Sequence, residues 1–143
     1  MPYFRIWTHI ILVTDERKPL LVGKVEEVLH QQFRLIAMEK GILVDCVGGG
    51  AEHLHLLVAV GSEQSIAYVV ETLSAASESY VNLNKLSQSP FSWHTDYLAF
   101  SVSHSLVDKV REYIKGQSVL HQRKSFHDEY REFCQKHGFG STK

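Results

Sequence analysis

The sequence predicts an α+β fold of the ferredoxin-like type, in which a four-stranded antiparallel sheet carries two helices on one face and further helices follow at the C-terminus. Apolar periodicities alternate along the chain in the order β-α-β-β-α-β, which is the order of a split βαβ sandwich. The chain has 143 residues, 44% of them hydrophobic and 22% charged, which is typical of one soluble globular core. We therefore expect residues 1–143 to form a single domain, with a core at about 3–120 and a C-terminal helix at about 121–138.

The first three elements are predicted between residues 4 and 47. Residues 4–14 are rich in aromatic and β-branched types and end at a charged turn closed by Pro19, which indicates a strand. Apolar residues recur at helical spacing over 21–40, and Gly41 follows where a helix would end. Residues 42–47 form a short apolar strand, and the three glycines at 48–50 permit a reversal of the chain.

The next two elements continue the pattern after this reversal. Residues 52–60 are expected to form a strand antiparallel to the preceding one. Residues 65–83 predict a helix whose inward side is formed by Ile66, Val70, Leu73 and Tyr80.

The last elements are a strand and two helices. Residues 97–103 predict the fourth strand. A helix is expected to open at Ser105, because Ser105 and Asp108 have the spacing of a capping box. The polar segment 124–136 predicts a further helix, which we expect to pack outside the core. The second face of the sheet is left uncovered in this arrangement.

Net charge gives no general sign of a nucleic-acid-binding protein. The formal charge is −1, whereas phosphate contacts usually require an excess of Lys and Arg. Basic residues are nevertheless unevenly distributed, and a local basic face is one interpretation of them; a solvated helix surface is the other. The candidate DNA-contacting residues are Arg5, Arg17, Lys109, Arg111, Lys115 and Arg123.

Cysteine usage and hydropathy indicate a cytoplasmic protein. Cys46 and Cys134 lie far apart, and neither has a second cysteine at the spacing of a zinc or redox motif, so free thiols are expected. No apolar stretch reaches the roughly 20 residues that a membrane-spanning helix requires, and no cleavage signal follows the first apolar run. The protein is thus expected to be neither secreted nor membrane-spanning.

A His-x-His pair lies on the predicted strand at 52–60. Because side chains alternate along a strand, His53 and His55 project from the same sheet face, whereas Leu54 and Leu56 point to the other face. Two imidazoles on one rigid strand form half of a metal site. The alternative is that both are ordinary histidines, although a buried pair would then need other polar partners.

A Tyr-x-x-x-Gln pair lies on the predicted helix that follows Ser105. Tyr113 and Gln117 are four residues apart and therefore share one helix side. On spacing alone, the pattern favours a core aromatic at Tyr113 and a helix-surface residue at Gln117. Gly116 costs about 1 kcal/mol in a helix interior relative to Ala, so the helix is short, ends here or must move.

Together these two pairs predict a metal-dependent phosphoryl-transfer site. Two imidazole nitrogens and one amide oxygen would hold a divalent cation, with open positions for phosphate oxygens or water. A tyrosine hydroxyl has an ordinary pKa near 10 and needs such a cation or a base to act as a nucleophile. Its attack would conserve bond energy in a phosphotyrosine linkage, whereas activated water would only hydrolyse DNA. Since His ligands must be neutral, metal binding should weaken below about pH 6.5.

The same residues resemble a known family. His53-Leu54-His55 matches a His-hydrophobic-His motif and Tyr113 to Gln117 matches a Tyr-x-x-x-Gln signature. By these motifs the sequence resembles the HUH-type single-tyrosine transposases of bacterial and archaeal insertion sequences, including the REP-associated tyrosine transposases. The similarity extends over nearly the whole chain, through the segments WTH, DERKPLL, EKGILVD, QSIAYVVETL and WHTDYLAFSVS.

The resemblance implies a function. It implies a homodimer with a ferredoxin-like fold that uses Mg²⁺ or Mn²⁺ to cut single-stranded DNA beside hairpins at the ends of a mobile element. It further implies that Tyr113 forms a 5′-phosphotyrosine intermediate with release of a 3′-hydroxyl, that His53, His55 and Gln117 hold the metal, and that Tyr113 can act in the partner subunit's site. A transposase of this type is expected in the cytoplasm, near the nucleoid.

Three other functions fit part of the pattern. A domesticated dimeric protein that binds hairpin DNA without transposition would keep the fold. A metal-dependent phosphoesterase would use His53 and His55 to activate water. A ferredoxin-like regulator would bind a small molecule without metal.

Some further residues have two readings from the sequence. His9 faces either the site or the core. Trp93 and Tyr97 either stack on DNA bases or pack against the helix at 65–83.

Overall fold

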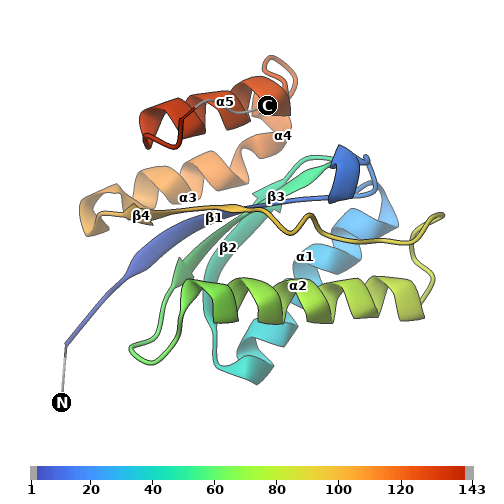
Figure 1. Ribbon diagram of the computed structural model, residues 1–143, viewed down its shortest axis with the longest axis horizontal. Coiled ribbons are helices and arrows are strands. Elements are labelled where there is room, and N and C mark those ends of the chain that lie inside the picture. The colour runs from blue at the N-terminus through green and yellow to red at the C-terminus, as the bar shows by residue number, and fades with distance from the viewer. Residues whose placement is uncertain (1–2, 141–143) are drawn as a thin grey trace.

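The computed structural model describes residues 3–140 of the chain, and Figure 1 shows the arrangement of their helices and strands. Residues 3–140 form four strands, five α-helices and two short 3₁₀ turns. In chain order the elements are β1 (Trp7–Val13), a 3₁₀ turn (Asp15–Arg17), α1 (Lys24–Lys40), β2 (Leu43–Gly49), β3 (His53–Ala59), α2 (Ile66–Leu83), β4 (Leu98–Val102), a second 3₁₀ turn (His104–Leu106), α3 (Val107–Lys115), α4 (Gln117–Leu120) and α5 (Phe126–Lys136).

The sheet has the topology that the sequence predicts. Its strand order is β2-β3-β1-β4, and every neighbouring pair is antiparallel. This confirms the ferredoxin-like βαββαβ sandwich. The observed elements begin and end within three residues of the predicted ones. The largest differences, three residues each, are at the starts of β1 and α1; β1 begins at Trp7 rather than at residue 4, and residues 4–6 are exposed.

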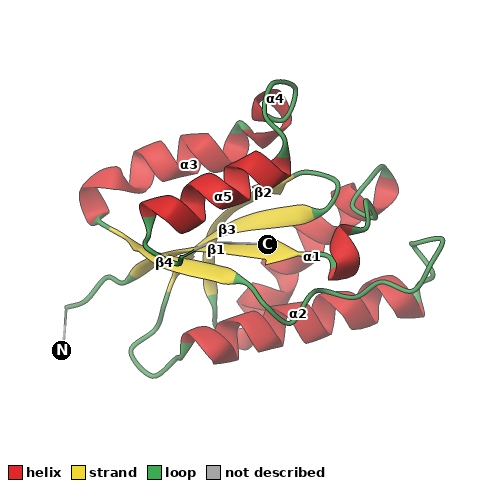
Figure 2. Cartoon of the chain, turned by 45° about the horizontal axis from the view of Figure 1, so that its top comes forward, coloured by secondary structure: helices red, strands yellow, loops and turns green. Residues whose placement is uncertain are grey.

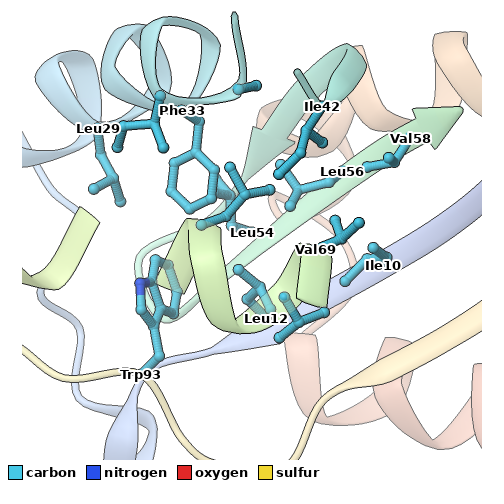
Figure 3. Close-up of a cluster of buried hydrophobic side chains, with 14 of the residues drawn as sticks. Ile10, Leu12, Leu29, Phe33, Ile42, Leu54, Leu56, Val58, Val69 and Trp93 are labelled. Carbon is cyan, nitrogen blue, oxygen red and sulfur yellow. The ribbon is translucent and has the colours of Figure 1, made fainter. Parts of the chain in front are cut away.

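The main core lies between one face of the sheet and the helices α1 and α2 (Figure 3). Alternate residues of the two central strands point into it, among them Ile10 on β1 and Leu54 and Leu56 on β3. Phe33 of α1 is fully buried in this cluster and meets the edge of the Trp93 ring. The leucines of β3 therefore occupy the face opposite the two histidines, as strand alternation predicts.

The buried side of α2 differs from the predicted one. It is formed by Val69, Val70, Leu73, Ser77 and Val81. Val70 and Leu73 are buried and Ile66 packs against the core, as predicted, whereas Tyr80 is partly buried and is not part of this cluster. Ser77 also faces the core, where its hydroxyl oxygen accepts a hydrogen bond from the indole N–H of Trp93 at 2.9 Å. Trp93 is thus buried against α2, which confirms the packing interpretation of this residue.

The second face of the sheet is covered by α3, α4 and α5 (Figures 1 and 2). The prediction that the C-terminal helix packs outside the core is wrong. Phe126 and Cys134 of α5 are buried together with Ile11, Val13 and Leu98 of the sheet in a second apolar cluster. Seven of the eleven residues of this helix are polar, but Phe126, Tyr130, Phe133 and Cys134 form a narrow apolar stripe that is sufficient to cover the sheet.

The helix that carries Tyr113 starts and ends differently from the predicted helix. The chain forms a 3₁₀ turn at His104–Leu106, and α3 begins only at Val107. Ser105 does not cap this helix, because its hydroxyl pairs with Ser103 and the carboxylate of Asp108 pairs with Arg111. The predicted capping box is therefore absent. The helix does end at Gly116, as its glycine suggests, and α4 restarts at Gln117.

A glycine on β2 allows α3 to lie directly on the sheet. A Cβ atom at Gly48 would collide with the backbone carbonyl of Ile114, which is fully buried in α3. The contact is reinforced by Arg111, whose guanidinium donates to both carboxylate oxygens of Asp45 on β2 at 2.8 and 2.9 Å. These two contacts determine how closely α3 approaches β2, the strand beside β3, which carries the histidines.

Both cysteines are buried free thiols, as predicted.

Within residues 3–140, no helix combines the length and the apolar composition that a membrane crossing requires.

Candidate functional site

The two histidines of β3 lie under the C-terminal helices. Both His53 and His55 are completely buried and project from the sheet face opposite Leu54, as the sequence predicts. The antiparallel register pairs His53 with Val13 and His55 with Ile11 on β1, so both imidazoles stand over the centre of the sheet. Their positions are thus determined by the pairing of β1 with β3.

The Tyr-x-x-x-Gln pair meets these histidines within the same chain. The Oε1 atom of Gln117 lies 2.8 Å from Nε2 of His53, and the Gln117 side chain is buried. The ring of Tyr113 lies edge-on to the ring of His55, with 5.7 Å between the centroids. The four site residues expected from the sequence, His53, His55, Tyr113 and Gln117, are therefore brought together by one chain.

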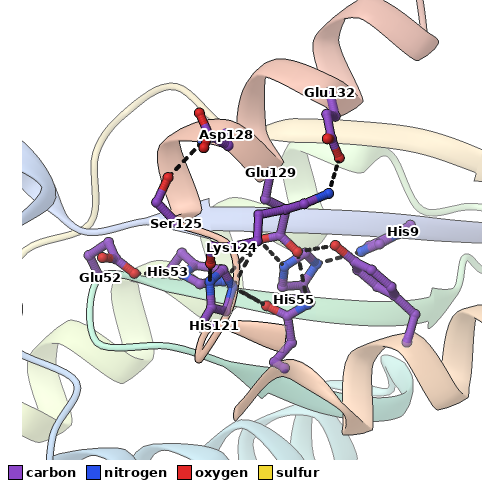
Figure 4. Close-up of polar contacts among 12 residues, drawn as sticks. His9, Glu52, His53, His55, His121, Lys124, Ser125, Asp128, Glu129 and Glu132 are labelled. Carbon is purple, nitrogen blue, oxygen red and sulfur yellow. Dashed lines mark hydrogen bonds and ion pairs between the residues drawn. The ribbon is translucent and has the colours of Figure 1, made fainter. Parts of the chain in front are cut away.

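Two further residues of the site were not predicted. Glu129 of α5 is 1% exposed, and its Oε1 atom lies 3.4 Å from Nε2 of both His53 and His55 (Figure 4). His121, just after α4, places Nε2 2.9 Å from Oε1 of Gln117 and 3.2 Å from Oε1 of Glu129. A sequence signal for Glu129 exists, because the residue stands between Phe126 and Phe133 on the apolar side of a polar helix.

The carboxylate of Glu129 connects the tyrosine with the histidines. Its Oε2 atom accepts hydrogen bonds from the hydroxyl of Tyr113 and from the side-chain amide of Gln117, the latter at 2.8 Å. Its Oε1 atom faces the two imidazoles and His121. One carboxylate thus contacts the candidate nucleophile with one oxygen and the candidate metal ligands with the other.

Burial and ion pairing shift the pKa values of the site strongly. Burial acts to lower the pKa of His53, but its contacts with Glu129, Glu52 and Gln117 outweigh this effect and raise the pKa to about 9. Burial lowers the pKa of His55. For Glu129, burial acts to raise the pKa, but the hydrogen bonds from His53 and His55 prevail and lower it. Burial and the Glu129 carboxylate raise the pKa of Tyr113 above its ordinary value.

The nitrogen and oxygen atoms of the site converge as metal ligands do. One ligand atom from each of His53, His55 and Glu129 lies within 4.8 Å of the other two, and Nε2 of each histidine lies 3.4 Å from Oε1 of Glu129, a separation that two ligands about 2.1 Å from one cation can have. The amide oxygen of Gln117 faces the same point, since it contacts Nε2 of His53. Two imidazoles, a carboxylate and an amide oxygen form a donor set that suits a divalent transition-metal ion.

The outer nitrogens of both imidazoles are also engaged. Nδ1 of His53 lies 2.8 Å from Oε1 of Glu52, and Nδ1 of His55 lies 2.7 Å from Nε2 of His9. His9 is 2% exposed. Its burial, and to a smaller extent the neighbouring His55, lower its pKa to about 2. His9 therefore faces the site as a neutral residue that touches His55.

The six basic candidates differ in their surroundings. Arg5, Lys109, Lys115 and Arg123 are exposed, and Lys115 lines a groove of about 300 Å³ that reaches Gln117 between α1, β2 and α3. Arg111 is engaged by Asp45 and Asp108. Arg17 lies over the rings of Phe126 and Tyr130 at 5.3 and 5.0 Å, so it packs against α5.

Comparison with known proteins agrees with this fold. Residues 2–117 match the family described as IS200-like transposases, and the chain belongs to this family. It is 27% identical to the ISDra2 transposase TnpA of Deinococcus radiodurans over 119 residues, which cover 80% of this chain and 85% of the relative. Transposition is therefore the general activity of the family to which the chain belongs.

Two solved structures are similar to the fold. One is described as a transposase from Deinococcus radiodurans R1, with a TM-score of 0.64 and 24% identity, covering 81% of this chain and 93% of that one. The other is a REP-associated tyrosine transposase bound to a REP hairpin, with a TM-score of 0.62 and 10% identity, covering 85% of this chain and 72% of that one. The family match ends at Gln117, so His121 and Glu129 lie beyond it.

The raised pKa of His53 is directly measurable. In the metal-free protein we expect NMR titration of the His53 ring to give a midpoint near 9, and Glu129→Gln to move this midpoint down, because the substitution removes the negative charge beside Nε2. The stabilisation from protonated His53 is complete below the ordinary pKa of 6.5 and is lost as pH rises through about 9. A midpoint near 6.5 in the wild type would contradict the arrangement.

Proposed function

We propose that the protein is a metal-dependent single-strand DNA transposase that cuts and rejoins DNA through a covalent bond to Tyr113. Membership of the IS200-like family supports the general activity. The observation that carries the mechanism is the convergence of the half-buried Tyr113 and the buried His53, His55 and Gln117 around one point. A protein that only binds DNA has no need of a tyrosine hydroxyl directed at a cluster of metal ligands.

His53, His55 and Gln117 are the proposed metal ligands, with Glu129 completing the set when no DNA is bound. Mg²⁺ prefers oxygen ligands and octahedral geometry, whereas Mn²⁺ accepts imidazole more readily. Of the two ions that the family resemblance implies, the two imidazoles favour Mn²⁺. When bound, the cation polarises the scissile phosphate and stabilises charge that develops on its oxygens.

The covalent step transfers one phosphoryl group. The Tyr113 oxygen forms a bond to the phosphorus atom, and the bond from phosphorus to the 3′ oxygen breaks. The products are a 5′-phosphotyrosine and a free 3′-hydroxyl, which receives the proton that the tyrosine loses. Because the phosphotyrosine conserves the energy of the broken bond, attack by another 3′-hydroxyl rejoins the DNA and restores the tyrosine.

The carboxylate of Glu129 occupies the place where a scissile phosphate would have to lie. It is an anionic group held between the hydroxyl of Tyr113 and the nitrogens of His53 and His55. All of these groups except Tyr113 are at most 1% exposed, so DNA cannot reach them in this conformation. We propose that α5 moves outward when DNA binds and that a phosphate oxygen replaces Glu129.

The proposed DNA substrate is a single strand next to a hairpin. The structural neighbour bound to a REP hairpin supports this choice for the fold, and the family resemblance supports it for the chain. The exposed residues Arg5, Lys109, Lys115 and Arg123 are the proposed phosphate contacts; Arg111 and Arg17, which already have protein partners, are weaker candidates.

Tyr113 and the proposed metal ligands lie together in one chain, which supports our proposal that Tyr113 acts in cis. The homodimer expected from the resemblance stays a prediction, as do a single domain over residues 1–143 and a cytoplasmic location near the nucleoid.

Metal binding is expected to depend on pH in a way that the sequence alone does not indicate. We propose a threshold above the pH of about 6.5 that the sequence suggests, because a cation must displace the proton from His53, whose pKa is raised to about 9 by Glu129, Glu52 and Gln117. Calorimetry with Mn²⁺ should show affinity that rises about tenfold per pH unit from about pH 6.5 to 8.5. His53→Ala and His55→Ala should abolish binding. Equal affinity across this range would contradict displacement of a proton.

The nucleophile is tested by comparing wild-type protein with Tyr113→Phe on labelled single-stranded DNA from the sequence flanking the gene, in the presence of Mn²⁺. Wild type should give a covalent protein–DNA band on a denaturing gel, and the variant should give none while still binding DNA. Tyr130→Phe, which alters a tyrosine on α5, is the matched control and should retain the band. Free cleaved product in both proteins would indicate a hydrolytic phosphoesterase instead.

A further inference from the structure

Each histidine of the proposed metal site must present one particular nitrogen. A neutral imidazole carries one N–H, and only the other nitrogen has a lone pair for a metal. In this site Nε2 of His53 and Nε2 of His55 point toward Glu129 and Gln117. Both rings must therefore carry their proton on Nδ1 when a cation is bound.

Each Nδ1 atom has a partner that can accept its hydrogen bond in this tautomer, which His55 adopts only when a cation replaces its Nε2 contact with Glu129. The carboxylate oxygen of Glu52 lies 2.8 Å from Nδ1 of His53, and Nε2 of His9 lies 2.7 Å from Nδ1 of His55 (Figure 4). A carboxylate can only accept from the ring, so Glu52 requires the proton on Nδ1 of His53. His9 acts in the same way toward His55 if its own proton lies on Nδ1.

Both acceptors are held in place by the fold. The backbone carbonyl of Glu52 accepts hydrogen bonds from the amide and the hydroxyl of Thr14, at 2.9 and 3.2 Å. Gly50 leaves room for the pair, because a Cβ atom there would stand 2.8 Å from Cε1 of His53 and 3.2 Å from the Glu52 carboxylate. A residue with a side chain at position 50 would therefore disturb this contact.

His9 is fixed by aromatic packing on both sides. Its ring meets the edges of Phe100 on β4 and Phe133 on α5, with centroids 4.8 and 5.4 Å away. On β1 it faces the same side of the sheet as His55 and lies diagonally across from it in the register. Its contact with Nδ1 of His55 is thus a product of the strand pairing.

We propose that Glu52 and His9 are positioning residues, which fix the tautomers of His53 and His55 so that both Nε2 atoms are free to bind the metal. The inference rests on the proposed function, because it concerns the same metal site. Such outer partners of metal-binding histidines typically change metal affinity by about 10–100-fold when removed.

Calorimetric titration of the full-length protein with Mn²⁺ tests the proposal. Glu52→Ala should weaken binding about 10–100-fold, whereas Glu52→Gln, which retains an oxygen acceptor, should recover most of the affinity. Likewise His9→Leu should weaken binding and His9→Gln should recover part of it. Glu71→Ala, which removes an exposed carboxylate from α2, is the matched control and should bind as the wild type does.

A structural role alone would give a different result. Thermal unfolding of each variant reports on folding, and NMR of the ring nitrogens in the Mg²⁺-bound protein reports which nitrogen of His53 carries the proton. Wild-type affinity in Glu52→Ala, together with lost binding in His53→Ala, would overturn the positioning role and leave the metal site intact. Absence of Mn²⁺ binding in the wild type would overturn the metal site and this inference with it.

Discussion

The functional face of this protein depends on one buried carboxylate. An ionised carboxylate is stable inside a protein only where positive or hydrogen-bonding partners surround it. Glu129 finds these partners in His53, His55, Gln117 and Tyr113, which arrive from β3, α3 and α4. The protonation of His53 and the restraint on the Tyr113 hydroxyl follow from this contact, and it acts together with buried Phe126 and Cys134 to hold α5 on the sheet.

The two faces of the sheet have separate tasks. The face toward α1 and α2 is filled by aliphatic and aromatic side chains and supplies the stability of the fold. The face toward α3, α4 and α5 has smaller apolar clusters and carries the polar site between them. Strand alternation divides the two, since Leu54 and Leu56 anchor β3 in the core while His53 and His55 remain on the other side.

The sequence predicts the parts of the site that follow from local periodicity. A period of two places His53 and His55 on one face, and a helical spacing of four places Gln117 near Tyr113. Glu129 could not be assigned in the same way, because its partners lie more than seventy residues away on β3 and depend on how α5 docks. Likewise the inward position of Ser77 on α2 depends on a hydrogen bond from the indole of Trp93, which lies outside this helix. The pKa of His53 also departs from the ordinary value of histidine, because its contact with Glu129 depends on the same docking of α5.

The central claim is that one chain contains the complete cutting site. It is tested most directly by mixing His53→Ala protein, which lacks a metal ligand, with Tyr113→Phe protein, which lacks the nucleophile, and assaying covalent attachment to labelled single-stranded DNA. Each variant alone should be inactive beside an active wild type. Because Tyr113 and the histidines of one chain lie together in this structure, the mixture should also be inactive. Restored attachment in the mixture would show that the tyrosine of one subunit serves the histidines of another, and would contradict the account.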